Sequence, residues 1–374
     1  MLHLKKSNTN ELVYGGYMKE YFMNYAISLA KKGIGFVNPG PLRGAVLVKD
    51  NKIIGEGNLP SYLGQQPELL AMDSINEVLS DSELYTVIEP SEEAVIEIIK
   101  RKVKIVYIGI PDLGIYKKEA SIKALEAAGI KVITGILKEE CTELNEIYSH
   151  YITKGTPFVF TKWAMTLDGK IASKTGDSKW ISGDESLKFV HELRQRVAAI
   201  MVGENTVRVD NPMLTTRLED VKISNPVRII LSKYGSVPDT SKILEVTEDT
   251  KTIFIVSENI SKEREEFLIK KNVELIKLKE FEGRLSFQDI IKALGDRNLD
   301  SLYIEGGSEV LASAFESKVV NKVYAAIAPK IIGGRSAITA VAGVGIERMK
   351  DAIILKRVTH EIVGVDVIFK GYIE

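Results

Sequence analysis

The chain has 374 residues, of which 45% are hydrophobic and 27% are charged, a length and composition that fit a globular protein of two domains. Its 50 basic and 51 acidic side chains nearly cancel. The chain therefore lacks the net positive charge that attracts nucleic acid or an anionic membrane, and neither partner is expected. The single cysteine, Cys141, excludes a disulfide framework, and the lack of a secretory signal or of a run of ~18 apolar residues predicts a cytoplasmic protein.

The first half of the chain alternates helix and strand patterns. Apolar residues at helical spacing predict a helix over 17–33, which ends at a glycine. Two short strands follow within 44–57, around the turn 49–52. The remaining elements are, in order, a helix from about residue 68, strand 84–89, helix 91–102, strand 103–110, helix 121–130 and strand 131–137. This order predicts an α/β layer structure with parallel crossovers.

A second α/β pattern begins after the segment 145–158, whose Gly155 and Pro157 interrupt the regular elements. We place the domain boundary there, with one domain over 1–150 and the other over 151–374. The elements expected in the second domain are strand 158–165, helix 184–196, strands 198–203, 227–232 and 251–257, helix 287–296, strand 301–306, helix 308–317, and strands 320–329 and 364–373.

Polar residues gather at three strand ends of the second domain, where α/β folds place their ligands. The three groups lie within 162–172, 201–217 and 302–311. In the third group two glycines open a helix at 306–308, and such glycines let backbone N–H groups approach a phosphate. Each group alone is a weak signal, because a Gly-Gly pair before a helix is more often only a turn.

Taken in order, and together with GDSKWISG (176–183) and PKIIGG (329–334), these groups resemble the reductase domain of the bifunctional riboflavin-biosynthesis deaminase–reductase family. The resemblance covers nearly all of residues 158–374. It implies a dihydrofolate-reductase-like fold and hydride transfer from NADPH to the ribose C1 of 5-amino-6-(5-phosphoribosylamino)uracil, which opens the sugar to the ribitylamino product. The alternative is a related reductase that acts on another phosphorylated pyrimidine or pterin.

The resemblance carries functional roles over to individual residues. Lys162 and Glu305 match the catalytic pair that flanks the reacting carbon, where a lysine aids ring opening or polarises the imine and a carboxylate stabilises the cationic carbon. Arginines suit the ribose phosphate, because their planar forks bind phosphate bidentately. The implied substrate contacts are Ser178, Arg194, Leu214, Arg217 and Glu305. The implied NADPH contacts are Met165, Trp180, Thr206, Asp210, Gly307, Ser308, Glu309, Val310, Leu311, Ala312 and Ser313.

Several positions also have simpler interpretations. Trp180 is equally well explained as a packing residue, and His191 as a solvated helix residue. Lys162 and Asp168 are explained as an ordinary salt bridge at a strand end. The chain departs from the family at Lys233, which follows a serine where relatives usually have Asp-Ser. We hypothesise that this lysine binds the adenosine 2′-phosphate instead.

Residues 17–148 resemble the family's cytidine-deaminase-like domain, but the zinc ligands are missing. The working domain holds zinc with one His and two Cys while a Glu moves protons, and its signature is H-x-E followed by P-C and a second Cys. Here these positions read Q-P-E (66–68) and P-S (90–91), the loop of the second cysteine is absent, and no histidine lies between His3 and His150. An amide and an un-ionised hydroxyl do not replace an imidazole and two thiolates. We therefore expect no zinc and no activated water.

The same pocket has lost further groups, with Gly40 in place of a loop asparagine and Leu59 in place of a histidine. Glu68 remains, but a carboxylate in the first turn of a helix is explained by the helix dipole. We expect an inactive deaminase domain that serves folding and assembly, and we leave pyrimidine binding open. The alternatives are a bifunctional enzyme that works without the usual ligands and a non-enzymatic binding protein. A homodimer is expected, since relatives associate through the reductase domain.

Overall fold

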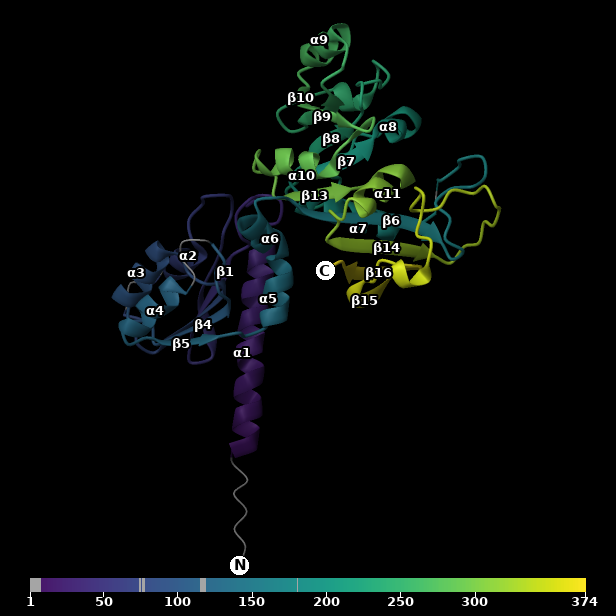
Figure 1. Cartoon of the computed structure of the whole chain (residues 1–374). Coiled ribbons are helices and arrows are strands. Elements are labelled where there is room, and N and C mark those ends of the chain that lie inside the picture. Colours follow the sequence, from purple (N-terminus) through teal and green to yellow (C-terminus); the bar gives the residue numbers. More distant parts are fainter. Residues whose placement is uncertain (1–7, 74, 76–77, 115–118, 180) are drawn as a thin grey trace, which may run out of the picture. The chain divides into compact units, whose positions relative to one another are not determined.

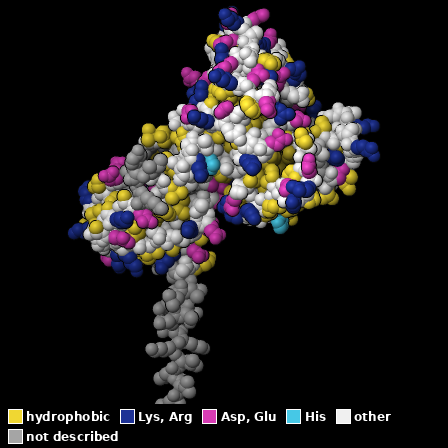
Figure 2. Space-filling model, in the orientation of Figure 1, with side chains coloured by type: hydrophobic (Ala, Val, Ile, Leu, Met, Phe, Trp, Pro, Cys, Tyr) yellow, Lys and Arg dark blue, Asp and Glu magenta, His cyan; other side chains and the backbone are white. Residues whose placement is uncertain are grey.

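The chain forms two compact units, Met1–Lys154 and Gly155–Glu374, in a computed structural model that describes residues 8–73, 75, 78–114, 119–179 and 181–374 (Figure 1). Each unit is a sheet covered by helices, so the predicted α/β class is confirmed. On the face shown in Figure 2, basic and acidic side chains are interspersed over the described surface of each unit. Within the described ranges, no helix has both the length and the apolar character needed to cross a membrane.

The N-terminal unit contains a five-stranded sheet in the order β2-β1-β3-β4-β5. β1 pairs antiparallel with β2 and β3, whereas β3, β4 and β5 are parallel. Asp50 and Asn51 turn the chain between β1 and β2 with φ angles of 52° and 59°, a conformation that two-residue hairpins require and that Asp and Asn tolerate. The strands are β1 (Gly44–Lys49), β2 (Lys52–Asn58), β3 (Ser82–Ile88), β4 (Ile105–Ile110) and β5 (Lys131–Thr134).

Helices cover both faces of this sheet, as Figure 1 shows. Side chains alternate along β1, so that Val46 and Val48 pack with α1 and α5 while Ala45 and Leu47 pack with α2, α3 and α4. The helices are α1 (Asn8–Lys31), α2 (Pro67–Asp73), α3 (Glu92–Lys100), α4 (Ala120–Ala127), α5 (Lys138–Leu144) and α6 (Glu146–Lys154). In the segment 145–158, where we placed the domain boundary, α6 covers most of the residues. The sequence pattern missed α5 and α6 because each helix is short and buries no more than two residues.

The C-terminal unit contains a nine-stranded sheet in the order β10-β9-β8-β7-β13-β6-β14-β16-β15. The strands from β10 to β14 are parallel, and β16 and β15 continue the sheet antiparallel. A two-stranded ribbon, β11 (Glu280–Phe281) and β12 (Arg284–Leu285), lies outside it. The sheet strands are β6 (Phe158–Thr166), β7 (Ala199–Gly203), β8 (Val227–Leu231), β9 (Thr252–Ser257), β10 (Glu274–Leu278), β13 (Ser301–Ile304), β14 (Lys322–Ala328), β15 (Lys356–Val363) and β16 (Asp366–Tyr372).

Helices pack on both faces of this sheet as well. Leu294 of α10 and Leu311 of α11 belong to a core formed with the apolar strands, and Phe189 of α7 contacts Tyr324 on the opposite face, where Tyr324 meets Phe160. The helices are α7 (Asp184–Arg196), α8 (Glu204–Asp210), α9 (Lys262–Lys270), α10 (Phe287–Gly295) and α11 (Ser308–Glu316). The sequence did not predict α8, α9, β10 or β15. α9 buries only Leu268, and β15 exposes nearly all its side chains, so neither shows a clear apolar period.

Candidate active site

The carboxyl ends of β6, β7 and β13 meet in the middle of the large sheet, because β13 lies between the other two strands. In the β6–β13 register Phe160 lies opposite Tyr303. Lys162 and Glu305, each two residues further along, therefore project from the same face. The fold brings Arg194 of α7 to this carboxylate from 111 residues away in the sequence. Lys162 and Glu305 are thus placed together, as the predicted catalytic pair requires.

Arg194 and Glu305 form a bidentate ion pair. Arg194 Nε donates to Glu305 Oε2 at 2.8 Å, and Nη2 donates to Oε1 at 2.6 Å. The third guanidinium nitrogen, Nη1, donates to the Thr215 carbonyl at 2.9 Å. Burial lowers the pKa of Arg194, but the Glu305 carboxylate more than offsets this, and the pKa is raised. The guanidinium fork that the sequence assigned to the substrate phosphate is therefore occupied by a carboxylate of the protein.

Lys162 is a nearly buried amine beside these charges, with a residue exposure of 8%. Burial lowers its pKa, and the neighbouring Arg194 charge acts in the same direction. The carboxylates of Glu305 and Asp366 act in the opposite direction but do not offset the burial. An ammonium with a lowered pKa transfers its proton more readily than an ordinary lysine near neutral pH, which suits a general acid.

A cavity of about 200 Å³ opens beside this cluster, between the end of β13 and the first turn of α11. At Gly306 an added Cβ would lie 2.8 Å from the Val202 Cα, so glycine permits the close contact of β13 with β7. Gly307 is different, because a Cβ there would meet only Thr206 Oγ1, at 3.7 Å. The lining residues are Lys162, Trp163, Ala164, Ile171, Tyr303, Glu305, Gly306, Gly307, Ser308, Leu311 and Ala340.

The N-terminus of α11 has the features of a phosphate-binding helix start. Gly307 is its cap residue and forms no side-chain capping bond with the first turn. The N–H groups of that turn therefore keep their capacity for an anion, and the helix dipole favours one. Of the predicted cofactor contacts in this stretch, Gly307 and Glu309 are exposed, Ser308, Val310 and Ser313 are half-buried, and Leu311 and Ala312 are buried. A phosphate-bearing ligand fits this helix start.

A second part of the site is the segment 214–217, which is held against α7. Leu214 is 3% exposed and has a φ of 58°. The Thr215 carbonyl accepts a hydrogen bond from Arg194. The Arg217 backbone N–H donates to His191 Nδ1 at 3.2 Å, whereas the Arg217 residue itself is exposed. Burial, with help from the nearby arginine charges, lowers the pKa of His191 to about 4. The interpretation of His191 as a solvated residue is therefore wrong: it is a neutral acceptor that holds this segment.

The remaining predicted contacts surround the cluster less closely. Met165 is half-buried near the end of β6, and Ser178 is exposed in the turn that precedes α7. Thr206 and Asp210 lie on α8, one helical turn apart, and the Thr206 hydroxyl lies 3.5 Å from the Gly307 nitrogen. The prediction for Trp180 falls outside the described residues.

Asp168 organises backbone at the edge of the site. Its carboxylate accepts bonds from Thr166 Oγ1 at 2.7 Å, from the Gly333 N–H at 2.7 Å and from the Ile332 N–H at 3.2 Å. The Thr166 hydroxyl and then the Gly333 N–H lower the pKa of Asp168 to about 2. Among the described ion pairs none joins Asp168 to Lys162, so the suggested salt bridge between them is absent.

The segment 330–342, called the strap below, crosses from this turn to α11. At one end the Leu167 N–H donates to the Lys330 carbonyl at 2.8 Å. At the other end Ala340 lines the cavity, and the Ala342 N–H donates to the Ser308 carbonyl at 3.2 Å. The strap therefore forms one wall of the cavity, a role that its sequence, PKIIGG included, did not reveal.

Lys233 has an anionic partner within the protein. Its Nζ lies 2.6 Å from Glu280 Oε2 and donates to the Gly283 carbonyl at 2.8 Å. Ser257 Oγ donates to the other oxygen of Glu280 at 2.6 Å. A phosphate at Lys233 would have to displace this carboxylate, which weighs against the hypothesis that Lys233 binds the adenosine 2′-phosphate.

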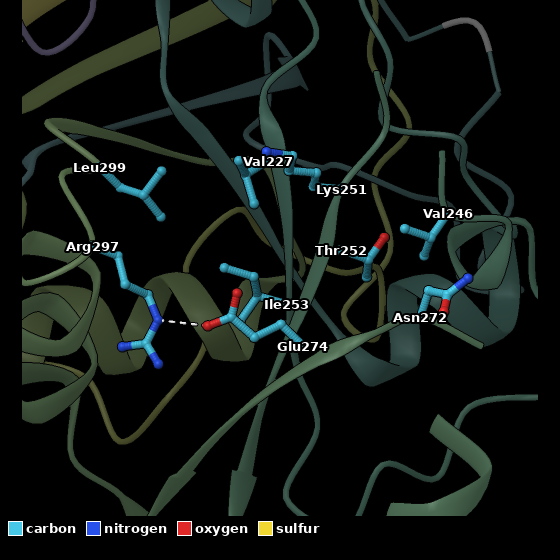
Figure 3. Close-up of a pocket in the computed structure, with 9 residues that line it drawn as sticks. All are labelled: Val227, Val246, Lys251, Thr252, Ile253, Asn272, Glu274, Arg297 and Leu299. Carbon is cyan, nitrogen blue, oxygen red and sulfur yellow. Dashed lines mark hydrogen bonds and ion pairs between the residues drawn. The ribbon is translucent and has the colours of Figure 1, made fainter. Parts of the chain in front are cut away.

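A larger cavity of about 400 Å³ lies at the opposite ends of the strands, near the starts of β8, β9 and β10 (Figure 3). Its Arg297 and Glu274 pair with each other, with Nε to Oε1 at 2.7 Å. In open α/β sheets ligands bind at the carboxyl ends of the strands. We therefore place the site at the smaller cavity, beside Lys162 and Glu305.

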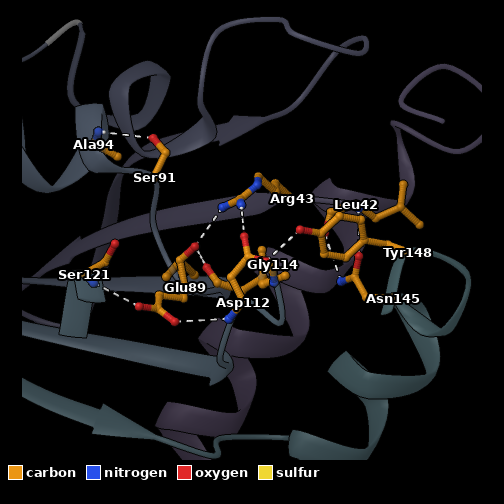
Figure 4. Close-up of polar contacts among 12 residues, drawn as sticks. Leu42, Arg43, Glu89, Ser91, Ala94, Asp112, Gly114, Ser121, Asn145 and Tyr148 are labelled. Atoms are coloured by element: carbon orange, nitrogen blue, oxygen red, sulfur yellow. Dashed lines mark hydrogen bonds and ion pairs between the residues drawn. The ribbon is translucent and has the colours of Figure 1, made fainter. Parts of the chain in front are cut away.

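The N-terminal unit also buries charges, and those around Arg43 satisfy one another (Figure 4). Arg43 donates to Asp112 Oδ2 and to the Glu89 carbonyl, both at 2.8 Å. Tyr148 Oη donates to Asp112 Oδ1 at 2.6 Å. The Glu89 carboxylate accepts backbone N–H bonds from Asp112 at 3.1 Å and from Ser121 at 3.0 Å, at the start of α4. This network joins β1, β3, β4 and α4 and is a structural element.

Of the two positions that the resemblance assigns to zinc ligands, Gln66 and Ser91, only Ser91 has a side chain with a structural role in the described part of the chain. Ser91 caps α3, with its Oγ accepting from the Ala94 N–H at 3.3 Å. Thr86 Oγ1 donates to Glu68 Oε1 at 2.6 Å, and burial raises the pKa of Glu68. Within the described ranges, Gln66 Oε1 and Glu68 Oε2 are buried without a hydrogen-bond partner. The same ranges contain no cluster of three or more His, Cys, Asp or Glu side chains arranged to hold a metal ion.

Comparison with known proteins gives matches over nearly the whole chain. A family model described as the RibD C-terminal domain matches residues 157–369. The riboflavin biosynthesis protein RibD of Actinobacillus pleuropneumoniae is 37% identical over 353 residues, which cover 93% of this chain and 93% of that protein. RibD of Aquifex aeolicus is 35% identical over 359 residues, which cover 94% of this chain and 98% of that protein.

Solved structures agree with these matches. A diaminohydroxyphosphoribosylaminopyrimidine deaminase/5-amino-6-(5-phosphoribosylamino)uracil reductase from Thermotoga maritima superposes with a TM-score of 0.82 and 33% identity, covering 96% of this chain and 100% of that one. RibD from Acinetobacter baumannii superposes with a TM-score of 0.84 and 25% identity, covering 96% and 99%. The predicted fold, a cytidine-deaminase-like unit followed by a dihydrofolate-reductase-like unit, is confirmed.

Proposed function

Because the chain belongs to the RibD family of riboflavin-biosynthesis proteins and is an oxidoreductase of that pathway, we propose that its C-terminal unit reduces 5-amino-6-(5-phosphoribosylamino)uracil with NADPH to the ribitylamino product. The observation that carries this proposal is the Lys162–Glu305–Arg194 cluster at the carboxyl ends of the central strands. The Thermotoga relative is a reductase of this pyrimidine by its description. The cluster places an acid and a carboxylate beside a cavity, which is what opening and reduction of a sugar require.

The catalytic roles follow from charge and burial. Lys162, whose pKa burial lowers, donates a proton as the ribose ring opens or polarises the imine that forms. Glu305 stabilises positive charge at the reacting carbon, and the bidentate bond from Arg194 fixes the direction of its carboxylate. Arg194 is in this account a positioning residue for Glu305.

The substrate phosphate is assigned to Arg217. Its side chain is exposed while its backbone is fixed by His191, so the guanidinium leaves a rigid segment and is accessible to a ligand. An arginine fork binds a phosphate bidentately. Leu214 supports the same segment from within, and Ser178 is assigned to a peripheral substrate contact.

The first turn of α11 is assigned to the cofactor phosphates. Its uncapped N–H groups, the open side of Gly307 and the Thr206 hydroxyl beside it are assigned to the anion-binding part of the site. Met165, Asp210 and the rest of the stretch from Gly307 to Ser313 are assigned to the same cofactor. When bound, NADPH supplies the hydride, and the protein contributes alignment and charge.

The N-terminal unit is proposed to be an inactive deaminase domain. The signature positions hold Gln66 and Ser91, and Ser91 is used as a helix cap. Neither side chain is a strong zinc ligand at neutral pH, and without a metal Glu68 has no activated water to serve. The cell then needs a separate enzyme that deaminates the pyrimidine before this protein reduces it.

The proposal is tested by following NADPH oxidation with two substrates, the aminated pyrimidine and its deaminated product. We expect turnover of the deaminated pyrimidine alone. Turnover of both pyrimidines, together with near-stoichiometric zinc in the purified protein, would show a bifunctional enzyme and refute the inactive domain. Turnover of neither would refute the substrate assignment and favour another phosphorylated pyrimidine or pterin, or a binding protein.

A homodimer joined through the C-terminal unit is proposed as the assembly. β15 is the last strand of the nine-stranded sheet, and its exposed side chains include Val358 at 53% and Ile362 at 77%. Such an edge offers backbone and apolar groups to a second copy in a symmetric pairing. Sedimentation of the protein should give a dimer, and Ile362→Asp should shift it towards the monomer. A wild-type protein that is monomeric at micromolar concentration would overturn the assignment.

A further inference from the structure

Helix α7 is bonded near each of its ends to a carboxylate that projects from the sheet. At its start, Asp366 Oδ2 accepts hydrogen bonds from the Gly183 N–H at 2.8 Å and from Ser186 Oγ at 2.6 Å. In its last turn, Arg194 binds Glu305. Glu305 lines the cavity, whereas Asp366 is 0% exposed at the start of β16. The proposed reaction uses Glu305 and assigns no role to Asp366.

Lys162 lies on the face of the sheet that α7 covers. In the strand registers Lys162 lies opposite Tyr324 of β14, and Tyr324 lies opposite Lys370 of β16. Asp366 is an even number of residues from Lys370 along β16, so its side chain projects from the same face. Phe189, near the middle of α7, contacts the Tyr324 ring edge to face, with centroids 5.6 Å apart. The helix thus lies over the strands that join Lys162 to Asp366.

Asp366 is a carboxylate at a position whose hydrogen bonds do not require one. Both bonds from α7 go to the same oxygen, Oδ2, and a neutral amide oxygen accepts such bonds equally well. Within the described ranges the other oxygen, Oδ1, is buried without a hydrogen-bond partner. A buried carboxylate is costly unless an opposite charge lies nearby. The choice of an acid at this position therefore points to a cation beneath α7.

Of the two cations in the Lys162–Glu305–Arg194 cluster, only Arg194 has a paired carboxylate. Lys162, which is 8% exposed, takes part in none of the described ion pairs. Burial lowers the pKa of Lys162, and the charges of Glu305 and then Asp366 raise it. The effect of Asp366 on this pKa is larger than that of Arg194, which lowers it. The charge of Asp366 therefore favours the ammonium form of Lys162.

The other ionisable groups around the amine contribute little charge near neutral pH. His191 is a neutral imidazole, because burial lowers its pKa to about 4. The Tyr303 hydroxyl keeps its proton, because burial raises its pKa. The remaining charged groups at this face are either screened by solvent or packed against tyrosine rings, and they are Asp184, Glu185, Lys370 and Lys322. The protonation of Lys162 is thus governed mainly by the two carboxylates that α7 contacts.

We propose that Asp366 is a positioning residue for the reduction, because its carboxylate acts through Lys162 and keeps the amine in the ammonium form while Glu305 serves the substrate. The reacting carbon becomes positive beside Glu305, so the charge of Glu305 is shared with the substrate during the reaction. Asp366 has no exposed surface and is out of the substrate's reach, so its charge continues to act on the amine. This inference rests on the proposed reductase function.

The test is Asp366→Asn, which removes the charge but keeps an oxygen that accepts from Gly183 and Ser186. Because Lys162 acts as an acid, kcat falls as pH rises and the ammonium loses its proton. Without the charge of Asp366 this fall should occur about one pH unit lower, the effect of one charge several ångströms away in a protein interior. The KM values for NADPH and the pyrimidine should stay unchanged, because Asp366 has no exposed surface. NADPH oxidation with the deaminated pyrimidine, followed as a function of pH, measures both.

Ser186→Ala is the matched control, because it removes a hydrogen bond to Asp366 and keeps the charge. It should lower Tm, since a buried hydrogen bond is lost, and leave the pH at which kcat falls unchanged. A shift in Ser186→Ala equal to that in Asp366→Asn would show that the placement of α7 is responsible and would overturn the inference. If Asp366→Asn does not fold, Asp366→Ser replaces it, and failure of both to fold would show that the fold itself requires the carboxylate, which also overturns the inference.

A second readout does not depend on turnover. Acetic anhydride acetylates only the neutral amine, so the pH dependence of Lys162 labelling, followed by mass spectrometry, reports the protonation of this amine. For Asp366→Asn, labelling should begin about one pH unit lower than in wild type. A labelling curve within about 0.3 pH unit of wild type would overturn the inference. A wild-type protein that turns over no pyrimidine would refute the proposed function, while the labelling curves would still decide the inference.

Discussion

Arg43 in the N-terminal unit and Arg194 in the C-terminal unit have the same kind of environment. Each is at most 8% exposed and donates to one carboxylate and one backbone carbonyl. They differ in what surrounds the carboxylate. Asp112 also accepts a hydrogen bond from Tyr148 and lies in a network of internal bonds, whereas Glu305 lines a cavity together with Lys162.

The difference shows how a buried charge is assigned to structure or to function. A charge whose partners are all internal stabilises the fold, and its removal leaves the other charges unpaired. A charge that lines a cavity retains capacity for a ligand. The same residue type, burial and carboxylate partner therefore have different consequences in the two units.

Replacement of Glu305 by Gln should give the largest effect. The amide keeps the shape but not the charge that stabilises the reacting carbon, so kcat should fall by about 10²–10³-fold. Steady-state NADPH oxidation with the deaminated pyrimidine measures this. Glu266→Gln, on the exposed face of α9, is the control and should leave kcat unchanged. A kcat within threefold of wild type for Glu305→Gln would remove Glu305 from the mechanism.

Replacement of Arg43 by Met should act on stability alone. Loss of one partner from a buried ion pair costs ~3–5 kcal/mol, and we expect about 2–3 kcal/mol here because the Asp112 side chain is 16% exposed. Denaturant unfolding should show this loss in the N-terminal unit, with reductase kcat unchanged. Lys100→Met, which removes the surface pair with Glu97 at 3.0 Å, should change stability by less than ~1 kcal/mol. Loss of reductase activity at full folding would contradict the structural role.

Replacement of His191 by Ala should act on substrate binding. The variant removes the acceptor for the Arg217 N–H, and the KM for the pyrimidine should rise about fivefold while the KM for NADPH stays constant. His191→Asn, which retains an acceptor near the Nδ1 position, should recover most of the loss. Because the pKa is about 4, the imidazole is neutral over pH 5–8, and binding should weaken only as pH falls towards 4. Equal KM values for the Ala and Asn variants would exclude this role.

Replacement of Glu68 by Gln should give the smallest effect. Burial raises the pKa of Glu68 in the folded unit, so the folded state binds a proton that the unfolded state releases above its pKa of ~4.3. Stability due to this group is therefore present at low pH and is lost as pH rises through the folded pKa. The Gln variant should have a Tm equal to or about 2 °C above wild type at pH 8, and this advantage should vanish towards pH 4. A lower Tm at pH 8 would show that the ionised carboxylate is stabilising.

Much of the fold was predictable because its elements have strong patterns. α7 was predicted with the bounds 184–196 that the structure shows, since its apolar residues follow a clear helical period. The β1–β2 turn was predicted from Asp50 and Asn51. β15 and α9 were missed because they face solvent on most sides, and hydrophobic periodicity reports burial rather than secondary structure itself.

The sequence predicted which residues belong to the site, but it did not predict the contacts among them. The resemblance named Lys162, Glu305 and Arg194, but the bond between the last two joins residues 111 positions apart and cannot be read from spacing. His191 looks like any polar helix residue until its contact with the 214–217 segment is known. In the sequence, Tyr303 looks like one more residue of a buried apolar strand. Whether its hydroxyl has a hydrogen-bond partner depends on its surroundings in the fold.

The central position of β13 has a consequence for synthesis of the protein. Its two neighbours in the sheet, β6 (Phe158–Thr166) and β7 (Ala199–Gly203), are made well before β13 (Ser301–Ile304). Until residue 301 is made, those strands have no shared partner, and the guanidinium of Arg194 has no carboxylate to meet. Between the synthesis of β7 and that of β13, a nascent chain therefore carries a sheet that lacks its central strand. The insertion of β13 between β6 and β7 completes the middle of the sheet and also brings Glu305 to Arg194. Catalytic activity therefore indicates that the central sheet of the reductase unit has formed.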